Sequence, residues 1–555
     1  MRSGLVACVL LASCGHGHPP ADARAGDGAV RAGTQVPRPA FLSRVPADTP
    51  YVYAALTPMP AAYFDREYLS RASRYQPLAE AFARLHKQNP DRFAKMTLGH
   101  RLGAALIAEL GTRTPAKALE MAGFDRAPRW ILYAAGASPV VRVEVRDPAR
   151  AAATLDRVLA WLAPVDRKRL GDIGYGVVDD GGRRWVFAIA QGELVVAVLA
   201  RNRFDAELPV ALAAREPTRS LASERTLERL AGDIGVAAWS LGFVDTVRLA
   251  SLLAMDMPAA CRDELPALAA LAPRISFGVR SASARQVQMV SLVELRRDVA
   301  SALDASRGRL AAEPDTQLNA SMTLGLAIDV AQASRLLDDA FDRISAKPYS
   351  CPALDGLNRL ARDQGSSLGW VATSPFGQVN GVTALMFAGD DTGGTHTPSG
   401  GVVLFSADQP AALLQAIAGV LPIGIPTTLK SGDAPVVVGG GIALPLSPIH
   451  VALGQHALGF AAGGRQAELV ELLAATPPAD SPIFYLGMHV RELSSLVGAS
   501  RADPPDPALA EVDADLAARL ATIEGESLDR FEEMSIRATP IARGLDMAID
   551  AHYGR

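Results

Sequence analysis

The chain has 555 residues, with 55 Lys and Arg against 59 Asp and Glu, which gives a formal net charge of −4. No dense basic run occurs, so the charge distribution argues against a nucleic-acid partner. With 49% hydrophobic and 21% charged residues, the composition is that of an ordinary globular protein. A chain of this length has room for two domains of roughly 250 residues, each with its own core.

Residues 1–13 have the pattern of a secretory signal peptide. Arg2 is the only charge before Asp22, and it precedes an apolar run from Gly4 to Ala12. A short positive end, an apolar run of about 7–15 residues and a small-residue cleavage point are typical of such a peptide. The run is too short to cross a bilayer, which takes about 20 apolar residues.

The end of this run, Leu11-Ala12-Ser13-Cys14, resembles the lipobox of bacterial lipoproteins. The resemblance implies that the Cys14 thiol receives a diacylglyceryl group and that Cys14 becomes the new N-terminus, with palmitate-type chains as the membrane anchor. The next residue is Gly15 and not Asp, which in Gram-negative lipoproteins favours the outer membrane, facing the periplasm. The alternative is an ordinary signal peptide, cleaved elsewhere, in which Cys14 is discarded.

Residues 14–39 are rich in Gly, Pro, Ala and charge and show no periodicity, which predicts a flexible tether. His16 and His18 lie in this tether, but two histidines lack the three or four ligands that a protein metal site needs. We therefore expect no metal here, and nothing elsewhere in the sequence indicates a cofactor.

The folded part begins with FLSRVPADTPYVYAAL, residues 41–56. This stretch resembles the domain start of a group of uncharacterised bacterial envelope proteins, which open with (L/V)PADT…Y before the first strand. The resemblance implies no known activity. In physical terms Pro46, Asp48, Thr49 and Pro50 predict a turn that leads Tyr51 into a strand.

Three pairs of segments match each other in the same order along the chain: 138–159 with 400–421, 192–212 with 455–474, and 236–253 with 482–497. In the first pair a strand is followed by an Asp (Asp147, Asp408) that suits a helix N-cap, and then by a Pro that suits the first helical turn. Three ordered matches predict a duplicated chain.

A smaller unit also recurs, made of a strand, a helix, a polar break and a hairpin. Its four hairpins are predicted at 129–145, 274–295, 367–387 and 534–553. Within the first, Val141, Val143 and Val145 alternate with polar residues, which is typical of a half-buried strand. Leu545, Met547 and Ile549 show the same alternation in the last hairpin.

These repeats predict an α+β fold with two related halves, 40–297 and 318–555, joined by a helix and loop at 298–317. Because hairpins occur without regular βαβ alternation, we expect antiparallel sheets with helices packed on one face.

Two cysteines, Cys261 and Cys351, remain once Cys8 leaves with the signal peptide and Cys14 carries lipid. An even number of thiols in an oxidising compartment favours a disulfide. Both occupy the segment between opening helix and hairpin in adjacent repeat units, so a pseudo-twofold axis would bring them together and the bridge would staple the two halves. Two buried free thiols are the alternative.

Sequence motifs for catalysis are missing: there is no HExxH, CxxC, GxSxG, SxxK or Walker loop. Asp179 to Gly182 read as a hairpin turn, and Gly439 to Gly441 as a bend. His450, His456 and His489 fall in the second half and would form a site only if the fold brought them together.

Four tryptophans, Trp130, Trp185, Trp239 and Trp370, fall on predicted strands, where packed core is expected before a binding groove.

The sequence therefore favours a membrane-anchored, periplasm-facing lipoprotein with a non-catalytic binding or scaffolding role toward an envelope protein or a hydrophobic ligand. Two alternatives stay open. One is an envelope hydrolase whose catalytic residues are dispersed in sequence, and the other is a carrier of a lipid or other hydrophobic ligand, which would need an apolar cavity.

Overall fold

The computed structural model describes residues 38–110, 115–162, 164–313, 320–389, 397–420, 424–438, 448–490 and 531–554. The described part combines helices with a large antiparallel sheet, which is the expected α+β class. It forms two compact units. Unit 1 contains the described residues up to Leu252 together with Ser276–Met289, and unit 2 contains the rest. The signal peptide, the lipobox with Cys14 and almost all of the tether lie outside the described residues.

The elements of unit 1 are, in chain order, η1(Ala40–Arg44), β1(Tyr51–Ala55), α2(Ala61–Gln88), α3(Pro90–Ala94), α4(Leu98–Leu110), α5(Pro115–Met121), β2(Trp130–Ala135), β3(Ser138–Glu144), α6(Pro148–Ala160), β4(Asp166–Leu170), β5(Ile173–Asp180), β6(Arg183–Ala190), β7(Glu193–Ala200), η2(Arg201–Arg203), α7(Phe204–Ala211), α8(Leu221–Glu224), α9(Thr226–Ile234) and β8(Leu241–Asp245). Three further elements have residues in both units: α10(Thr246–Ala254), β9(Arg274–Ala282) and β10(Gln286–Glu294).

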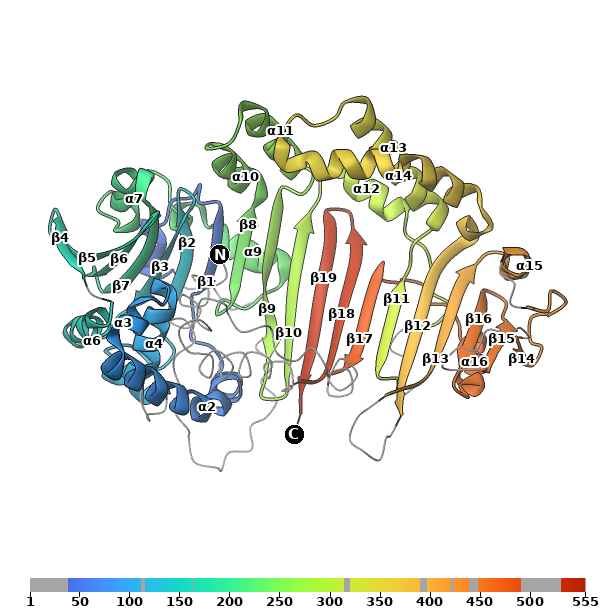
Figure 1. Ribbon diagram of the computed structural model, residues 1–555, viewed down its shortest axis with the longest axis horizontal. Helices are drawn as coiled ribbons and strands as arrows, with labels where there is room; N and C mark the ends of the chain where they lie inside the picture. Colours follow the sequence, from blue (N-terminus) through green and yellow to red (C-terminus); the bar gives the residue numbers. More distant parts are fainter. Residues whose placement is uncertain are drawn as a thin grey trace. The chain divides into compact units, whose positions relative to one another are not determined.

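The strands of unit 1 lie in the order β4-β5-β6-β7-β3-β2-β1-β8, and every neighbouring pair is antiparallel (Figure 1). The hairpin predicted at 129–145 is confirmed as β2 and β3, with Gly136 at φ +63° in the turn. The turn at Asp179–Gly182 is confirmed too, because Asp180 pairs with Arg183. Among the described strands β4 pairs with β5 alone, and its residues from Asp166 to Arg169 are exposed.

The PADT stretch, residues 46–49, forms the turn that leads into strand β1. The turn runs from Pro46 to Thr49, whose backbone N–H donates to Pro46 O at 3.3 Å, and β1 begins at Tyr51, as the sequence predicts. The Thr49 hydroxyl is buried, donates to Ala134 O and accepts from Ala134 N–H, both at 3.0 Å. One side chain therefore satisfies two backbone groups of β2, which accounts physically for the Thr of the motif.

Helices cover both faces of the unit 1 sheet, so the expectation of helices on one face is wrong. Val141 and Val143 of β3 pack against α4, α5 and α6. Between them, Arg142 points to the opposite face, where its Nη2 donates to Ala211 O of α7 at 2.7 Å. A strand covered on both faces is buried throughout, and Arg142 is accordingly 0% exposed.

The elements of unit 2 are α11(Ala259–Ala269), α12(Arg297–Ala305), β11(Met322–Leu326), α13(Val330–Ala346), η3(Pro352–Leu354), α14(Asp355–Thr373), η4(Pro375–Gln378), β12(Val379–Gly389), β13(Thr397–Ala407), α15(Pro410–Val420), β14(Val436–Val437), β15(Ile449–Leu453), β16(Ala457–Ala462), α16(Gln466–Ala474), β17(Phe484–His489), β18(Phe531–Ile541) and β19(Gly544–Tyr553). The strands lie in the antiparallel order β19-β18-β17-β11-β12-β13-β16-β15-β14 (Figure 1).

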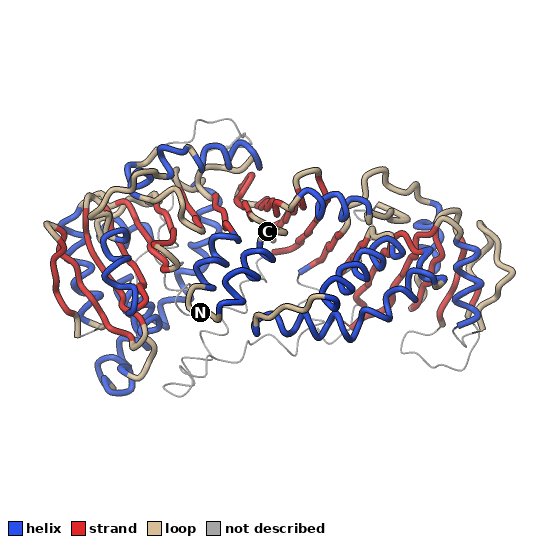
Figure 2. The backbone as a smooth tube through the Cα atoms, turned by 90° about the horizontal axis from the view of Figure 1, so that it is seen from above, coloured by secondary structure: helices blue, strands red, loops and turns tan. Residues whose placement is uncertain are grey.

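Helices α13 and α14 lie side by side in both views (Figures 1 and 2). The second of them corrects the sequence analysis: residues 367–373, predicted as the first strand of a hairpin, form the last two turns of α14. Trp370 accordingly lies on a helix, and it is 64% exposed. The hairpins at 274–295 and 534–553 are confirmed as β9–β10 and β18–β19.

At β13, helices cover both faces of the unit 2 sheet. Leu404 of β13 packs against Leu469 and Leu472 of α16. The next residue, Phe405, points to the other face and packs with Leu413 and Ile417 of α15.

Cys261 of α11 and Cys351, the N-cap of η3, are joined by a disulfide with their Cα atoms 4.6 Å apart. Both cysteines are 0% exposed and form a small core with Leu354. The carboxylate of Glu264 accepts the backbone N–H of Ser350 at 2.9 Å and that of Cys351 at 2.8 Å. Because Leu253–Ile275 belongs to unit 2, the disulfide lies within unit 2.

Candidate functional site

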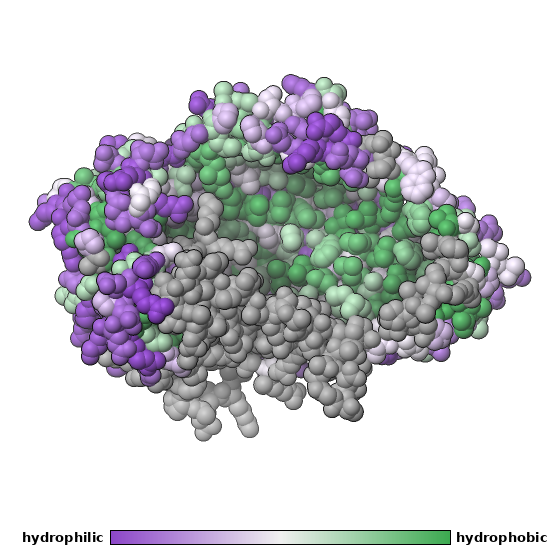
Figure 3. All heavy atoms as spheres, in the orientation of Figure 1, coloured by the Kyte–Doolittle hydropathy of each residue, from purple (hydrophilic) through white to green (hydrophobic). Residues whose placement is uncertain are grey.

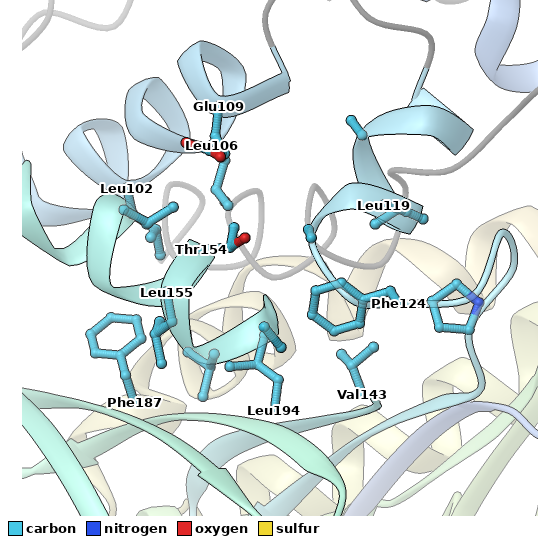
Figure 4. A pocket seen from close by; sticks show the side chains of 16 residues that line it. Leu102, Leu106, Glu109, Leu119, Phe124, Val143, Thr154, Leu155, Phe187 and Leu194 are labelled. Carbon is cyan, nitrogen blue, oxygen red and sulfur yellow. The ribbon is translucent and has the colours of Figure 1, made fainter. Parts of the chain in front are cut away.

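An apolar cavity of about 90 Å³ lies in unit 1, between the sheet and helices α4, α5 and α6. Sixteen residues line it (Figure 4), and among their side chains only Glu109 and Thr154 are polar. In the close-up, Leu102, Leu155 and Phe187 point into the space from one side and Leu119 and Phe124 from the other.

Helical and strand periodicity together build this lining. Leu98, Leu102 and Leu106 recur every four residues on α4, so they share one face of the helix. The floor is formed by cross-strand partners, which always project to the same face of a sheet: Val143 lies opposite Leu194 and Phe187 opposite Val196. Nothing in the local sequence of any one element indicates that the helices and the sheet leave a space between them.

The turn before β2 brings Phe124 to the cavity. Gly123 has φ +88°, and a Cβ atom there would lie 2.5 Å from Asp147 O, so only glycine fits. Its own carbonyl accepts the N–H groups of Arg146 and Asp147, both at 2.9 Å. Asp147 in turn is the N-cap of α6, as predicted, and accepts Arg150 N–H at 3.1 Å. The predicted equivalent, Asp408, instead accepts a hydrogen bond from Asn380 Nδ2 at 2.9 Å.

Polar groups gather around the two polar lining residues. Arg157 of α6 donates through Nε and Nη2 to the Glu109 carboxylate of α4, with Nε 3.0 Å from Oε1. Its Nη2 also lies 2.9 Å from Thr154 Oγ1. The hydrogen bonds with Glu109 raise the pKa of Arg157. A carboxylate, a guanidinium and a hydroxyl thus stand at one side of an otherwise apolar space, with Arg157 and Glu109 partly in solvent.

A second, more open pocket of about 580 Å³ lies in unit 1 near the start of α2 and has charged walls. Two of its lining residues form an ion pair with each other, with Arg129 Nε 2.6 Å from Glu144 Oε2, and this bonding raises the pKa of Arg129. The pairing leaves neither Arg129 nor Glu144 as an isolated charge, and the apolar part of the lining comes from Leu56, Pro58, Met59, Ala61 and Ala127.

On the opposite face of the same sheet lies a buried polar network around Arg142. The guanidinium donates to Tyr133 Oη at 3.1 Å, to Glu193 Oε2 at 2.6 Å and to Ala211 O at 2.7 Å. Arg44 binds the other oxygen of the Glu193 carboxylate. Because arginines bind both oxygens of the Glu193 carboxylate, the network stabilises the fold and does not present an acid or base ready to react.

A second buried acid, Glu207 of α7, accepts a hydrogen bond from Ser138 Oγ at 2.5 Å. Burial raises the pKa of Glu207, and the bond from Ser138 and the charge of Arg203 oppose this only in part. A serine beside a carboxylate lacks the intermediate base that activates a nucleophile in a triad. The pair therefore joins α7 to the sheet and gives no sign of acyl-transfer chemistry.

The three histidines singled out in the sequence do not share a site. His450 lies on β15, His456 in the turn before β16, and His489 at the end of β17, 3.7 Å from Glu533. Five strand spacings separate β15 from β17, which is about 24 Å at 4.8 Å per strand. In the described part of the chain, no three His, Cys, Asp or Glu residues are grouped so that they could hold a metal ion.

The other residues singled out in the sequence fall into three groups. Trp130 and Trp185 lie on β2 and β6, as predicted, and Trp185 is buried in the core that encloses the cavity. Trp239 lies in the turn before β8 and not on a strand. Cys14 and Gly439–Gly441 fall outside the described residues.

No helix in the part of the chain that the structure describes has the length and apolarity needed to cross a membrane.

Comparisons with known proteins add no relative: no family model, no curated protein and no solved structure matches this chain.

Proposed function

We propose that this chain is a lipoprotein anchored through Cys14 to the outer membrane, and that its folded part faces the periplasm and binds an apolar ligand without catalysing a reaction. The observation that carries the binding role is the cavity of unit 1, which is lined by aliphatic and aromatic side chains with Glu109 and Thr154 as its polar exceptions. Removing hydrocarbon from water favours its entry, and a few polar groups would orient it.

The size of the cavity limits what enters it. An engineered cavity of about 150 Å³ lined by Leu, Ile and Phe binds benzene. A space of about 90 Å³ therefore suits the end of an acyl chain or a small apolar group and not a whole lipid. A polar substituent next to the bound hydrocarbon would lie beside Thr154, Glu109 and Arg157, whose hydrogen bonds link α4 to α6.

We also propose that the two units arose by duplication, as the ordered sequence matches predict. The strand pairings support this, because they follow the same pattern in each unit. β1 pairs with β2 and β8, and β11 pairs with β12 and β17. β3 pairs with β7, and β13 with β16. The matched segments of the sequence fall on these corresponding strands.

The binding role is tested by filling the cavity. Ala122 lines it and is half-exposed, so Ala122→Phe adds a ring with little cost elsewhere. Ala153→Phe on the exposed face of α6 is the matched control. Benzene serves as the probe, because a ligand that binds only the folded state raises the unfolding midpoint. We expect benzene to raise it for the wild type and for Ala153→Phe, and Ala122→Phe to abolish the rise.

The natural ligand is sought by mass spectrometry of lipids that co-purify with the chain from its own envelope. We expect a hydrocarbon-containing ligand, reduced in Ala122→Phe and retained in Ala153→Phe. A chain that carries no such ligand and crosslinks instead to one defined envelope protein would contradict ligand binding and support a scaffold. For the anchor, Cys14→Ser should move the protein from the membrane to the soluble fraction, and unchanged fractionation would contradict lipidation.

A further inference from the structure

The half-exposed side of the unit 2 sheet is apolar where a solvent-facing sheet would be polar. On β11 the residues Met322, Leu324 and Leu326 are half-buried, while Thr323 and Gly325 between them are buried. An antiparallel sheet with one face in water normally alternates apolar residues inward with polar residues outward. Here the more exposed set is the more hydrophobic of the two.

Strand register aligns these side chains into rows across the sheet. Met534 of β18 lies opposite Met488 of β17, Met488 opposite Met322 of β11, and Met322 opposite Met386 of β12. Directly opposed residues project to the same face with Cβ atoms about 5 Å apart, so the four methionines form one continuous row.

A second row runs parallel to the first. Leu486 lies opposite both Leu324 and Ile536, and Ile536 lies opposite Ile549 of β19. We call the half-buried residues of these rows and their neighbours the methionine face: Met322, Leu324, Leu326, Ala384, Met386, Phe484, Leu486, Met488, Met534, Ile536, Met547 and Ile549. It holds five of the chain's 12 methionines and no charged residue. Apolar residues gather over these strands in Figure 3.

The dimensions of the methionine face indicate the kind of occupant. Five strands give four spacings, or about 19 Å across, and Met322 to Leu326 spans about 14 Å along the strand, on the order of 270 Å² in all. A stable protein–protein interface takes about 800 Å² from each partner. One lipid chain spans half of a bilayer's hydrocarbon core, about 15 Å, which fits within the length of a row.

We propose that the methionine face binds an acyl chain of a phospholipid, laid across strands β19, β18, β17, β11 and β12. Methionine is unbranched and flexible, so a row of methionines adapts to a fluid hydrocarbon chain better than β-branched residues do. The site is separate from the cavity of unit 1, which is too small for such a chain, and each can be tested without the other.

The test uses the full chain carrying Cys14→Ser, so that no lipid of its own competes. The probe is a phosphatidylethanolamine with a photoreactive diazirine in its palmitoyl chain, offered in vesicles of phosphatidylethanolamine and phosphatidylglycerol. After irradiation, mass spectrometry locates the crosslinked residues. We expect crosslinks concentrated in residues 322–326 and 484–488, and a loss of at least tenfold in yield when the facing pair Leu324 and Leu486 is changed to Asp.

Matched variants separate binding from folding. Leu324→Met with Leu486→Met keeps the face apolar and should retain the yield, as should Ala122→Phe. Circular dichroism checks that the Asp variant is folded, and the crosslink map of the chain with intact leucines tests the proposal even if that variant is not. Crosslinks absent from both segments would overturn it, and so would a dimer that the Asp variant dissociates, since a second copy would then be the occupant. Failure of benzene to raise the unfolding midpoint of the wild type, with lipid crosslinks retained, would overturn the cavity alone.

Discussion

Replacement of Arg142 by Leu tests how far unit 1 depends on its buried polar network. The substitution leaves Tyr133 Oη, Ala211 O and one oxygen of Glu193 without the donor that each now has. Removing one partner of a buried ion pair costs about 3–5 kcal/mol. Arg44 still binds the Glu193 carboxylate, so we expect a loss near the lower end, about 3 kcal/mol, which is a large share of a typical stability of 5–15 kcal/mol.

Guanidinium denaturation followed by far-UV circular dichroism measures this loss. The midpoint should fall for Arg142→Leu, and it should recover in part when Glu193→Leu is added, because replacing a whole buried pair by apolar residues is often neutral. Arg44 can turn toward solvent in the double variant, since its side chain is already 19% exposed. A loss below about 1 kcal/mol, the worth of one ordinary hydrogen bond, or a double variant less stable than the single one, would refute the reasoning.

Three further changes probe other parts of the fold. Burial raises the pKa of Glu207 above its ordinary 4.5, so the stability that it contributes is present at lower pH and is lost as pH rises through the raised pKa. Glu207→Gln should therefore raise the denaturation midpoint at pH 8 and leave it unchanged near pH 4. An equal shift of the midpoint at both pH values would contradict this. Cys261→Ser with Cys351→Ser removes a disulfide that spans 90 residues, which should cost about 4–5 kcal/mol in the transition of unit 2. Reduction of the wild type should lower its midpoint as well. A variant with a lowered midpoint, beside a wild type whose midpoint does not change on reduction, would contradict this. Thr49→Val removes both hydrogen bonds to Ala134 and should cost about 1–3 kcal/mol, measured against Thr218→Val as an exposed control.

Local signals in the sequence were sufficient for elements whose determinants lie close together. The hairpin at 129–145 has both strands and its turn within seventeen residues, and Asp147 caps the helix that starts at the next position. The prediction of a strand at 367–373 failed because Trp370 and Val371 have high strand propensity, yet the α13–α14 pairing holds this segment in a helix.

The methionine face and the buried network of Arg142 depend on long-range contacts that the sequence does not display. Met322 and Met488 meet only because β11 pairs with β17, more than 160 residues away, and a register shift of one residue would turn one of them to the other face. Arg142 looked like the polar side of an alternating strand, and its burial follows from α7, which begins some sixty residues later. The sequence shows the alternation of Leu545, Met547 and Ile549. It does not show that Met547 and Ile549 belong to a larger apolar face.

Strand β4 of unit 1 and strand β14 of unit 2 each pair with one neighbour among the described strands. Their free edges bear on how the protein behaves when it is concentrated. A bare strand edge offers unpaired N–H and C=O groups to any passing chain, and so it can seed fibrils. In unit 1, the exposed charged run Asp166-Arg167-Lys168-Arg169 of β4 repels other chains from this edge. In unit 2, β14 is only two residues long, so it offers few groups for pairing. The first safeguard is electrostatic and weakens as salt shortens the Debye length to about 3 Å at 1 M. The second is geometric and does not depend on salt.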